Sequence, residues 1–443
     1  MSIERAVYGF LDDLQELNLH GFLLSLRGET LAEGYFSPFT ADRPHRLYSV
    51  SKSCVSLAVG LLADDGALSL TERIVDCFPE WTGEHTSPLL REVTIRHMLT
   101  MSTCYDRAQY SPLGDADWTR PFFYGRPTHP AGTLFSYDTS ASQVLCALVE
   151  RRAGCDILSF LERRLFAPLG MTGEKRWLKD RAGTSQGGTG LIMTLRDFAK
   201  LANFCMSDGR GLISSAYLRE ATGKQIDTGE RSGPEERYGY GYQFWRMREG
   251  FSMYGLGGQM ALCLPERGIS LCTTADLILD APGVQPIYDA FFRRFAHVDE
   301  LAHDARDAEA LRERVQSLRC EPLHGEAGKA LRVRLPHTSL PFDALEISPE
   351  AVTFRIDGQP HALPYGNGHW AEGVFPTTAE LCMASGGWRT PTRFELACQL
   401  TGDFACTLLL FVSLSGARAA VRVVGSLGEC AAGWNGLSWG EAS

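Results

Sequence analysis

The residues that could carry covalent chemistry begin with a serine and a lysine at helical spacing. Ser49 and Lys52 are three residues apart, and residues at this spacing share one face of a helix. A serine hydroxyl is a poor nucleophile until a base takes its proton, and a buried lysine can lose its charge and act as that base. The chain has only six lysines, and no other lysine has a serine three residues before it. We therefore predict that Ser49 is a nucleophile and Lys52 its activator.

The setting of this pair favours a catalytic role. A polar approach at 47–49 runs into an apolar helical pattern at 53–62, which places Ser49 at the N-terminus of a helix. The helix dipole there favours negative charge that develops during a reaction. The same position also suits a serine that only caps the helix, and the sequence leaves that alternative open.

A covalent mechanism also needs a group that passes a proton to the leaving group. Tyr137 is the candidate, because it lies between a strand-like run and a helical run within 130–142. A tyrosine in such a place is, taken alone, more often a packing residue. Its assignment therefore depends on the wider pattern of the chain.

The serine–lysine pair belongs to a set of sequence elements. They are Tyr-Ser-Val-Ser-Lys-Ser at 48–53, Gly-Thr-Leu-Phe-Ser-Tyr at 132–137, and supporting stretches at 61–70, 95–102, 188–197 and 238–242. In combination these elements resemble the serine β-lactamase-related and penicillin-binding hydrolases, especially the branch similar to class C β-lactamases. The resemblance covers about residues 5–297. It implies that Ser49 is acylated, that Lys52 activates it, and that Tyr137 is the general base and acid.

Two elements depart from the pattern of that family. The Y-x-N element reads Tyr137-Asp138-Thr139, so Thr139 stands where the family has an asparagine that contacts substrate. The K-T-G or H-x-G element is found at 255–259, with Leu256 in place of the lysine or histidine. In the family this cation binds the carboxylate of β-lactams and D-peptides. Its absence disfavours those substrates but does not disfavour acyl transfer.

The glycines of the third element still let a strand edge approach a substrate closely. We therefore expect Thr139, Leu256, Gly257 and Gly258 to contact the substrate. By the same resemblance, the backbone N–H groups of Ser49 and Gln259 form the oxyanion hole.

The predicted elements of the first part of the chain indicate an α+β fold. An antiparallel sheet flanked by helices receives a large helical insertion, and the site lies in the cleft between the two. The expected elements are a helix at 4–18, strands at 21–28 and 30–36, a helical block at 53–230, strands at 238–245, 250–254, 260–264 and 269–273, and a helix at 286–295.

Beyond a charged helical stretch at 299–319, the pattern becomes one of short alternating strands with Gly, Pro and Asn turns. It predicts a C-terminal all-β domain of sandwich or barrel type. The strands are expected at 331–335, 351–356, 394–400, 406–412 and 420–424. We divide the chain into a catalytic domain at 1–298, a helical linker at 299–322 and a small β-domain at 323–443, to which we assign no chemistry.

Composition excludes several other classes of protein. A net charge of −10 argues against nucleic-acid binding, and no apolar run approaches the length of a membrane span. Residues 1–20 carry acidic side chains where a signal peptide is apolar, so a cytoplasmic location is expected. Histidines and cysteines are scattered without metal-ligand spacing, and we expect neither a metal nor a cofactor.

The favoured function is that of a serine hydrolase which cleaves ester or amide bonds of a small molecule or peptide through an acyl-enzyme on Ser49. An acyltransferase or peptide cyclase that uses the same acyl-enzyme is one alternative. A catalytically silent binding protein is another, favoured by the altered second and third elements. The sequence leaves the oligomeric state open.

The cysteines give a first testable prediction. Thirteen cysteines are scattered through apolar runs without any C-x-x-C, which is typical of reduced, buried thiols. A thiol titration under denaturing, non-reducing conditions should therefore find nearly all of them free. Several disulfides would contradict both this interpretation and the cytoplasmic location.

Overall fold

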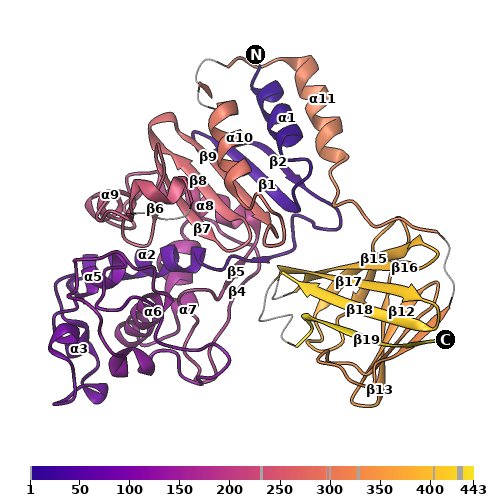
Figure 1. Cartoon of the computed structure of the whole chain (residues 1–443). Coiled ribbons are helices and arrows are strands. Elements are labelled where there is room, and N and C mark those ends of the chain that lie inside the picture. The colour runs from indigo at the N-terminus through magenta and orange to yellow at the C-terminus, as the bar shows by residue number, and fades with distance from the viewer. Residues whose placement is uncertain are drawn as a thin grey trace.

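A six-stranded antiparallel sheet organises the first part of the chain (Figure 1). The structure is a computed structural model that describes residues 2–229, 233–295, 297–298, 301–326, 330–402, 405–426 and 433–443. The strand order is β2-β1-β9-β8-β7-β6, so the start and the end of this domain meet in one sheet. The strands are β1 (Leu19–Leu26), β2 (Glu29–Tyr35), β6 (Trp245–Arg246), β7 (Phe251–Gly255), β8 (Gln259–Leu264) and β9 (Ile269–Ala275).

Helices cover both faces of this sheet. On one face lie α1 (Ile3–Asp13) and α10 (Gln285–Phe295), and α11 (Ala305–Gln316) packs against α1 and β2 (Figure 1). On the other face α8 (Leu195–Cys205) contacts β1, β8 and β9. Because successive side chains of a strand point to opposite faces, the strands contribute side chains to the buried cores on both faces of the sheet.

The helical insertion between β2 and β6 surrounds one central helix, α2 (Val50–Asp64). Every residue of α2 from 50 to 62 is buried, and the helix packs against α6, α7, α9 and β7. The remaining elements of the insertion are β3 (His45–Arg46), α3 (Ile74–Cys77), α4 (Pro88–Arg91), α5 (Ile95–Leu99), α6 (Thr139–Ala153), α7 (Ile157–Leu161), β4 (Lys175–Trp177), β5 (Leu191–Met193) and α9 (Ser215–Thr222). The strands β3, β5 and β4 form a small sheet that leads into α2.

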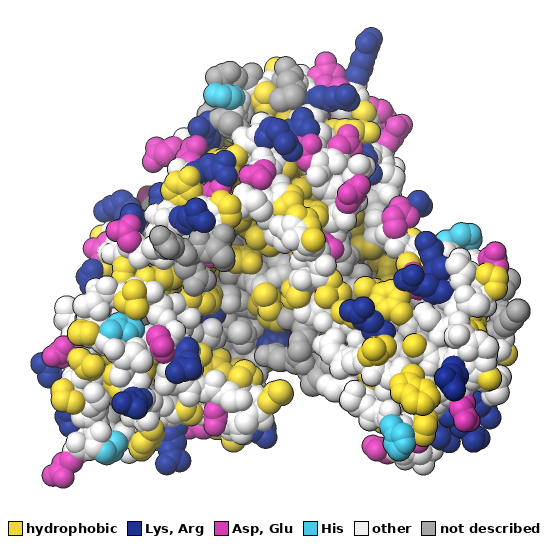
Figure 2. Space-filling view, in the orientation of Figure 1, with side chains coloured by type: hydrophobic (Ala, Val, Ile, Leu, Met, Phe, Trp, Pro, Cys, Tyr) yellow, Lys and Arg dark blue, Asp and Glu magenta, His cyan; other side chains and the backbone are white. Residues whose placement is uncertain are grey.

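The C-terminal part is a ten-stranded antiparallel sheet that curls into a barrel-like domain (Figure 1). Its order is β13-β12-β11-β10-β19-β18-β17-β16-β15-β14, and the two ends, β13 and β14, contact each other. Figure 2 shows the molecule hollowed between this barrel and the helical insertion. The strands are β10 (Leu331–Arg334), β11 (Ala344–Ile347), β12 (Ala351–Ile356), β13 (Gln359–Pro364), β14 (Ala371–Val374), β15 (Leu381–Thr390), β16 (Arg393–Thr401), β17 (Ala405–Ser415), β18 (Arg418–Gly425) and β19 (Gly436–Ala442).

The predicted α+β fold with a helical insertion and a C-terminal all-β domain is confirmed. The predicted strand at 238–245 is wrong, because only Trp245 of that stretch belongs to a strand. Its alternating aromatic residues are a buried loop: Tyr240 and Tyr242 are 1% and 0% exposed. Gly239 and Gln243 bend the chain there with φ values of 115° and 65°. We retain the domain boundaries 1–298, 299–322 and 323–443 as a proposal.

Two composition-based expectations can be compared with the described residues. Among these residues no helix combines the length and the apolar character that crossing a membrane requires. The twelve described cysteines are free thiols, whereas Cys430 lies outside the described residues.

Candidate active site

The structure brings Ser49 and Lys52 into direct contact. The Lys52 ammonium donates hydrogen bonds to Ser49 Oγ at 2.9 Å and to the carbonyl of Gly188 at 2.9 Å. Ser49 is half-buried and immediately precedes α2, but its side chain makes no capping hydrogen bond to that helix. The alternative that Ser49 is only a cap therefore has no support in this geometry.

The neighbouring serines have other partners. Ser51 Oγ donates to the carbonyl of Tyr48 at 2.6 Å and accepts the N–H of Leu191 at 2.9 Å, so it ties the start of α2 to β5. Ser53 Oγ donates to the carbonyl of Gln243 at 2.7 Å. Ser49 is thus the serine of this turn whose hydroxyl contacts the lysine.

Burial controls the charge of Lys52. The residue is 1% exposed, and removal from water lowers its pKa to about 7, against a smaller opposing effect of the Asp138 carboxylate. A lysine with such a pKa exchanges its proton near neutral pH. The ammonium that now donates to Ser49 Oγ can, once neutral, accept the hydroxyl proton.

Asp138 is the buried acidic group that faces this lysine. Burial raises the pKa of its carboxyl to about 6, while hydrogen bonds from Ser140 and the charge of Lys52 act in the opposite direction. One oxygen caps α6 by accepting the Ser140 N–H at 2.8 Å. The other, Oδ2, is buried and has no hydrogen-bond partner within the described part of the chain. The sequence around Asp138 does not indicate this role, because nothing local reveals its proximity to Lys52.

Tyr137 lies beside the lysine. Lys52 Nζ is 5.0 Å from the centroid of the Tyr137 ring. The ring stacks on Trp245 at 5.4 Å and meets the edge of Tyr240 at 6.3 Å. Tyr240 lies in the buried loop before β6 and Trp245 begins that strand, and both fix the ring of Tyr137 against the site.

Thr139 and Gly188 complete this side of the site. A Cβ atom added to Gly188 would lie 2.3 Å from Thr139 Cγ2 and 3.3 Å from Lys52 Nζ. Only glycine fits there, and its carbonyl is one of the acceptors of Lys52. The only sign of this role in the sequence is the glycine-rich run Gly187-Gly188-Thr189-Gly190, which indicates close backbone packing.

The third element forms the opposite side. Gly255 ends β7, and a Cβ atom on it would lie 2.1 Å from the carbonyl oxygen of Leu47, so this strand edge runs directly against the segment before Ser49. Leu256, in the turn that follows, is 46% exposed. Gly257 and Gly258 make that turn with φ values of 82° and 98°, which favour glycine.

The placement of Gln259 argues against the predicted role of its N–H group in the oxyanion hole. Gln259 is fully buried and begins β8, which is covered by β7 on one side and β9 on the other. Its amide group braces the turn, since Nε2 donates to the carbonyls of Leu256 at 3.0 Å and Ala275 at 2.6 Å. The backbone next to Leu47 is that of Gly255, which Leu256 directly follows.

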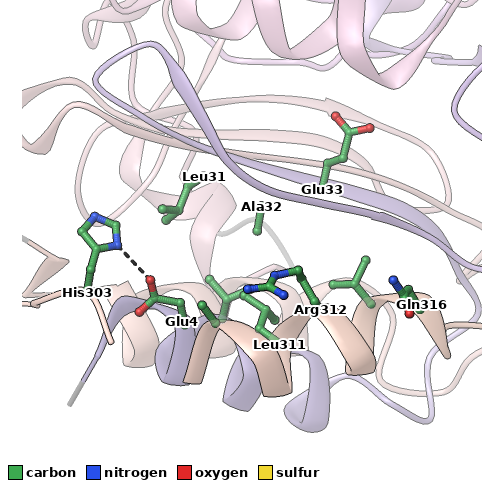
Figure 3. Close-up of a pocket in the computed structure, with 11 residues that line it drawn as sticks. Glu4, Leu31, Ala32, Glu33, His303, Leu311, Arg312 and Gln316 are labelled. Carbon is green, nitrogen blue, oxygen red and sulfur yellow. Dashed lines mark hydrogen bonds and ion pairs between the residues drawn. The ribbon is translucent and has the colours of Figure 1, made fainter. Parts of the chain in front are cut away.

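A separate hollow of about 380 Å³ lies between α1, α11 and β2 (Figure 3). Leu31 and Leu311 face into it, and Glu4 at its rim is hydrogen-bonded to His303. None of the predicted site residues lines this hollow. In the described ranges, no cluster of three or more His, Cys, Asp and Glu side chains could hold a metal ion.

Comparison with known proteins gives a consistent assignment. The family model described as Beta-lactamase matches residues 21–275. The 6-aminohexanoate-dimer hydrolase of Paenarthrobacter ureafaciens is 26% identical over 214 residues, which cover 44% of this chain and 54% of that protein. The chain thus spans about half the length of this curated relative.

Two solved structures show the extent of the shared fold. The D-amino acid amidase from Ochrobactrum anthropi SV3 has a TM-score of 0.53 and 18% identity, and the match covers 67% of this chain and 99% of that one. The octameric penicillin-binding protein homologue from Pyrococcus abyssi has a TM-score of 0.51 and 14% identity, and the match covers 95% and 98%. The second match therefore extends over the C-terminal barrel as well.

The shifted pKa values of Lys52 and Asp138 predict how activity depends on pH. With neutral Lys52 as the proton acceptor, kcat/KM should rise with pH through an apparent pKa near 7. Asp138→Asn removes a negative charge that stabilises the ammonium, so the acid limb should move to lower pH. The measurement is a pH–rate profile of both proteins. The control is Asp156→Asn, which removes the carboxylate that caps α7 and should leave the limb in place; an unmoved limb in Asp138→Asn would contradict the coupling.

Proposed function

We propose, from the premise that the chain belongs to the β-lactamase family, that it cleaves amide or ester bonds of a small molecule or peptide through an acyl-enzyme on Ser49. The observation that carries the proposal is the 2.9 Å contact between Lys52 Nζ and Ser49 Oγ. A buried lysine with a pKa near 7 is a base that works at neutral pH. The relatives named as amide hydrolases support the bond type.

The geometry supports the following sequence of steps. Ser49 Oγ attacks the carbonyl carbon of the substrate, and Lys52 Nζ takes the hydroxyl proton. The oxyanion of the tetrahedral intermediate accepts hydrogen bonds from the N–H of Ser49, at the start of α2, and from the N–H of Leu256. Leu256 replaces Gln259 in this proposal because it directly follows Gly255, the residue whose backbone lies against the carbonyl of Leu47.

The proton must then reach the leaving group. Tyr137, held beside Lys52 by Trp245, donates its phenolic proton to the departing nitrogen or oxygen as the carbonyl re-forms, and Lys52 returns to the phenolate the proton that it took from Ser49. Water next attacks the acyl-enzyme, gives up its proton to the same base system, and releases the acid with Ser49 restored. Thr139, Gly257 and Gly258 line the path of the substrate in this proposal.

The proposal for the nucleophile predicts the outcome of two matched substitutions. Ser49→Ala should lower kcat by about 10³-fold or more, as in other covalent catalysts. Ser51→Ala removes the hydrogen bonds to Tyr48 and Leu191, so it should lower thermal stability while the nucleophile persists. For both variants, kcat is measured by turnover of an ester, the nucleophile by labelling with a fluorophosphonate probe, and stability by the melting temperature. Near-normal turnover in Ser49→Ala with loss in Ser51→Ala would show that the register is wrong.

The exposed Leu256 predicts the class of substrate. A charge-assisted hydrogen bond to a substrate carboxylate is worth about 1.5–3 kcal/mol, or about one to two decades in affinity, and leucine cannot make one. Uncharged acyl esters and amides should therefore be turned over faster than penicillins or D-Ala-D-Ala peptides, as kcat/KM values will show.

Two variants test this prediction, and each replaces an exposed leucine with a lysine at a different place. Leu256→Lys should recover some preference for carboxylate-bearing substrates. Leu437→Lys, at a site that is 67% exposed on the barrel, controls for the added charge. Hydrolysis of penicillin by the unmodified protein at the rate of a simple ester would instead point to another cation in the cleft.

A further inference from the structure

The C-terminal barrel contacts the residue that precedes the nucleophile. Tyr48 is 5% exposed, and its side chain belongs to the buried apolar cluster of the barrel. Its backbone has a φ of 45°, an uncommon value for a residue with a side chain. The guanidinium of Arg46, a residue of the catalytic domain, lies 4.8 Å from the centre of the Tyr48 ring. The barrel therefore packs directly next to Ser49.

A second interdomain contact lies at the end of β9. Asp276 directly follows this strand and is 3% exposed. Its Oδ2 accepts the backbone N–H of Thr407 at 2.6 Å and the hydroxyl of Ser426 at 2.5 Å. Both donors belong to the C-terminal barrel, so a buried carboxylate of the catalytic domain is bound by the other domain.

Two amide side chains complete this network. Asn18 Nδ2 donates to the carbonyl of Asp276 at 3.3 Å and to Thr407 Oγ1 at 3.1 Å, and Asn18 Oδ1 accepts Gln399 Nε2 at 3.2 Å. Thr407 Oγ1 in turn donates to Gln399 Oε1 at 3.0 Å. Gln399 and Thr407 are buried and Asn18 is half-buried. A network whose members satisfy one another fixes a single relative position of the groups that form it.

The same strand end holds the third element of the active site. Leu277, the residue after Asp276, donates its N–H to the carbonyl of Gly257 at 3.0 Å. Ala275, the residue before it, binds the Gln259 amide through both its N–H and its carbonyl, and that amide also binds the carbonyl of Leu256. A displacement of Asp276 therefore reaches the Leu256 turn through hydrogen bonds on both sides.

We propose that Asp276 is a positioning residue through which the C-terminal barrel sets the location of the Leu256 turn relative to Ser49. The described residues of the barrel add no reacting group, but the site is complete only when the two domains are docked. This inference rests on the proposed acyl-enzyme function. Since misplacement by about 1 Å can cost about 10²-fold in rate, the coupling should appear in the acylation step.

The test is a double-mutant cycle across the interface in the full chain. Asp276→Asn places an NH₂ group or a weaker acceptor opposite the Thr407 N–H and Ser426 hydroxyl, and Ser426→Ala removes one donor from the barrel side. Each should slow fluorophosphonate labelling of Ser49 and lower kcat about 10-fold, with KM nearly unchanged. The double variant should be no slower than the slower single variant, because both break the same contact.

A matched control separates positioning from loss of stability. Tyr365→Phe removes the hydrogen bond from Tyr365 to the carbonyl of Ser348, at 2.8 Å within the barrel, and should lower the melting temperature without slowing labelling. Folded Asp276→Asn and Ser426→Ala proteins that label at the wild-type rate would overturn the coupling alone. A wild-type protein that does not label at Ser49 would overturn the proposed function and this inference together.

Discussion

The burial of Lys52 is the constraint on which the rest of the active site depends. A lysine in water keeps its proton at neutral pH and cannot accept one from a serine. With Lys52 1% exposed, loss of hydration brings its pKa to about 7, so the ammonium and the amine are both accessible states. Gly188, Ser49 and the ring of Tyr137 lie around the amine. The charge of Asp138 limits how far burial lowers the lysine pKa.

Such burial requires enclosure of a whole helix, which explains why the catalytic domain carries so large an insertion. A helix that is buried all round its circumference, as α2 is from 50 to 62, cannot lie on a surface. It needs neighbours on every side, and α6, α7, α9 and β7 supply them. The sheet contains the first and last strands of the domain, while the insertion creates the low-dielectric surroundings in which Lys52 lies.

The features that could be predicted from the sequence are those that depend on residues close together in the chain. The spacing of Ser49 and Lys52 lies within one helical turn, and the strands of the barrel alternate with period two, as in β10 and β18. Contacts between distant segments could not be found this way: Gly188 and Asp138 acquire their roles only through the fold. The stretch 238–245 was misassigned because aromatic residues alternate there for burial in a loop, and alternation alone cannot distinguish such a loop from a strand.

The charges around the nucleophile also bear on the kind of chemistry that suits the cleft. The ammonium and the amine of Lys52 are both accessible near neutral pH, a buried carboxyl lies near it, and the position that could hold a cation is an exposed leucine. Tyr137 and Trp245 present aromatic surface beside these groups. In such surroundings, fixed N–H dipoles stabilise an oxyanion more strongly than they would in water. A fixed cation would bind a carboxylate equally in the ground state and the transition state, which tightens binding without raising kcat. In the proposed mechanism the site therefore places its electrostatic stabilisation where charge develops during the reaction, at the carbonyl oxygen, and leaves recognition to shape and apolar contact.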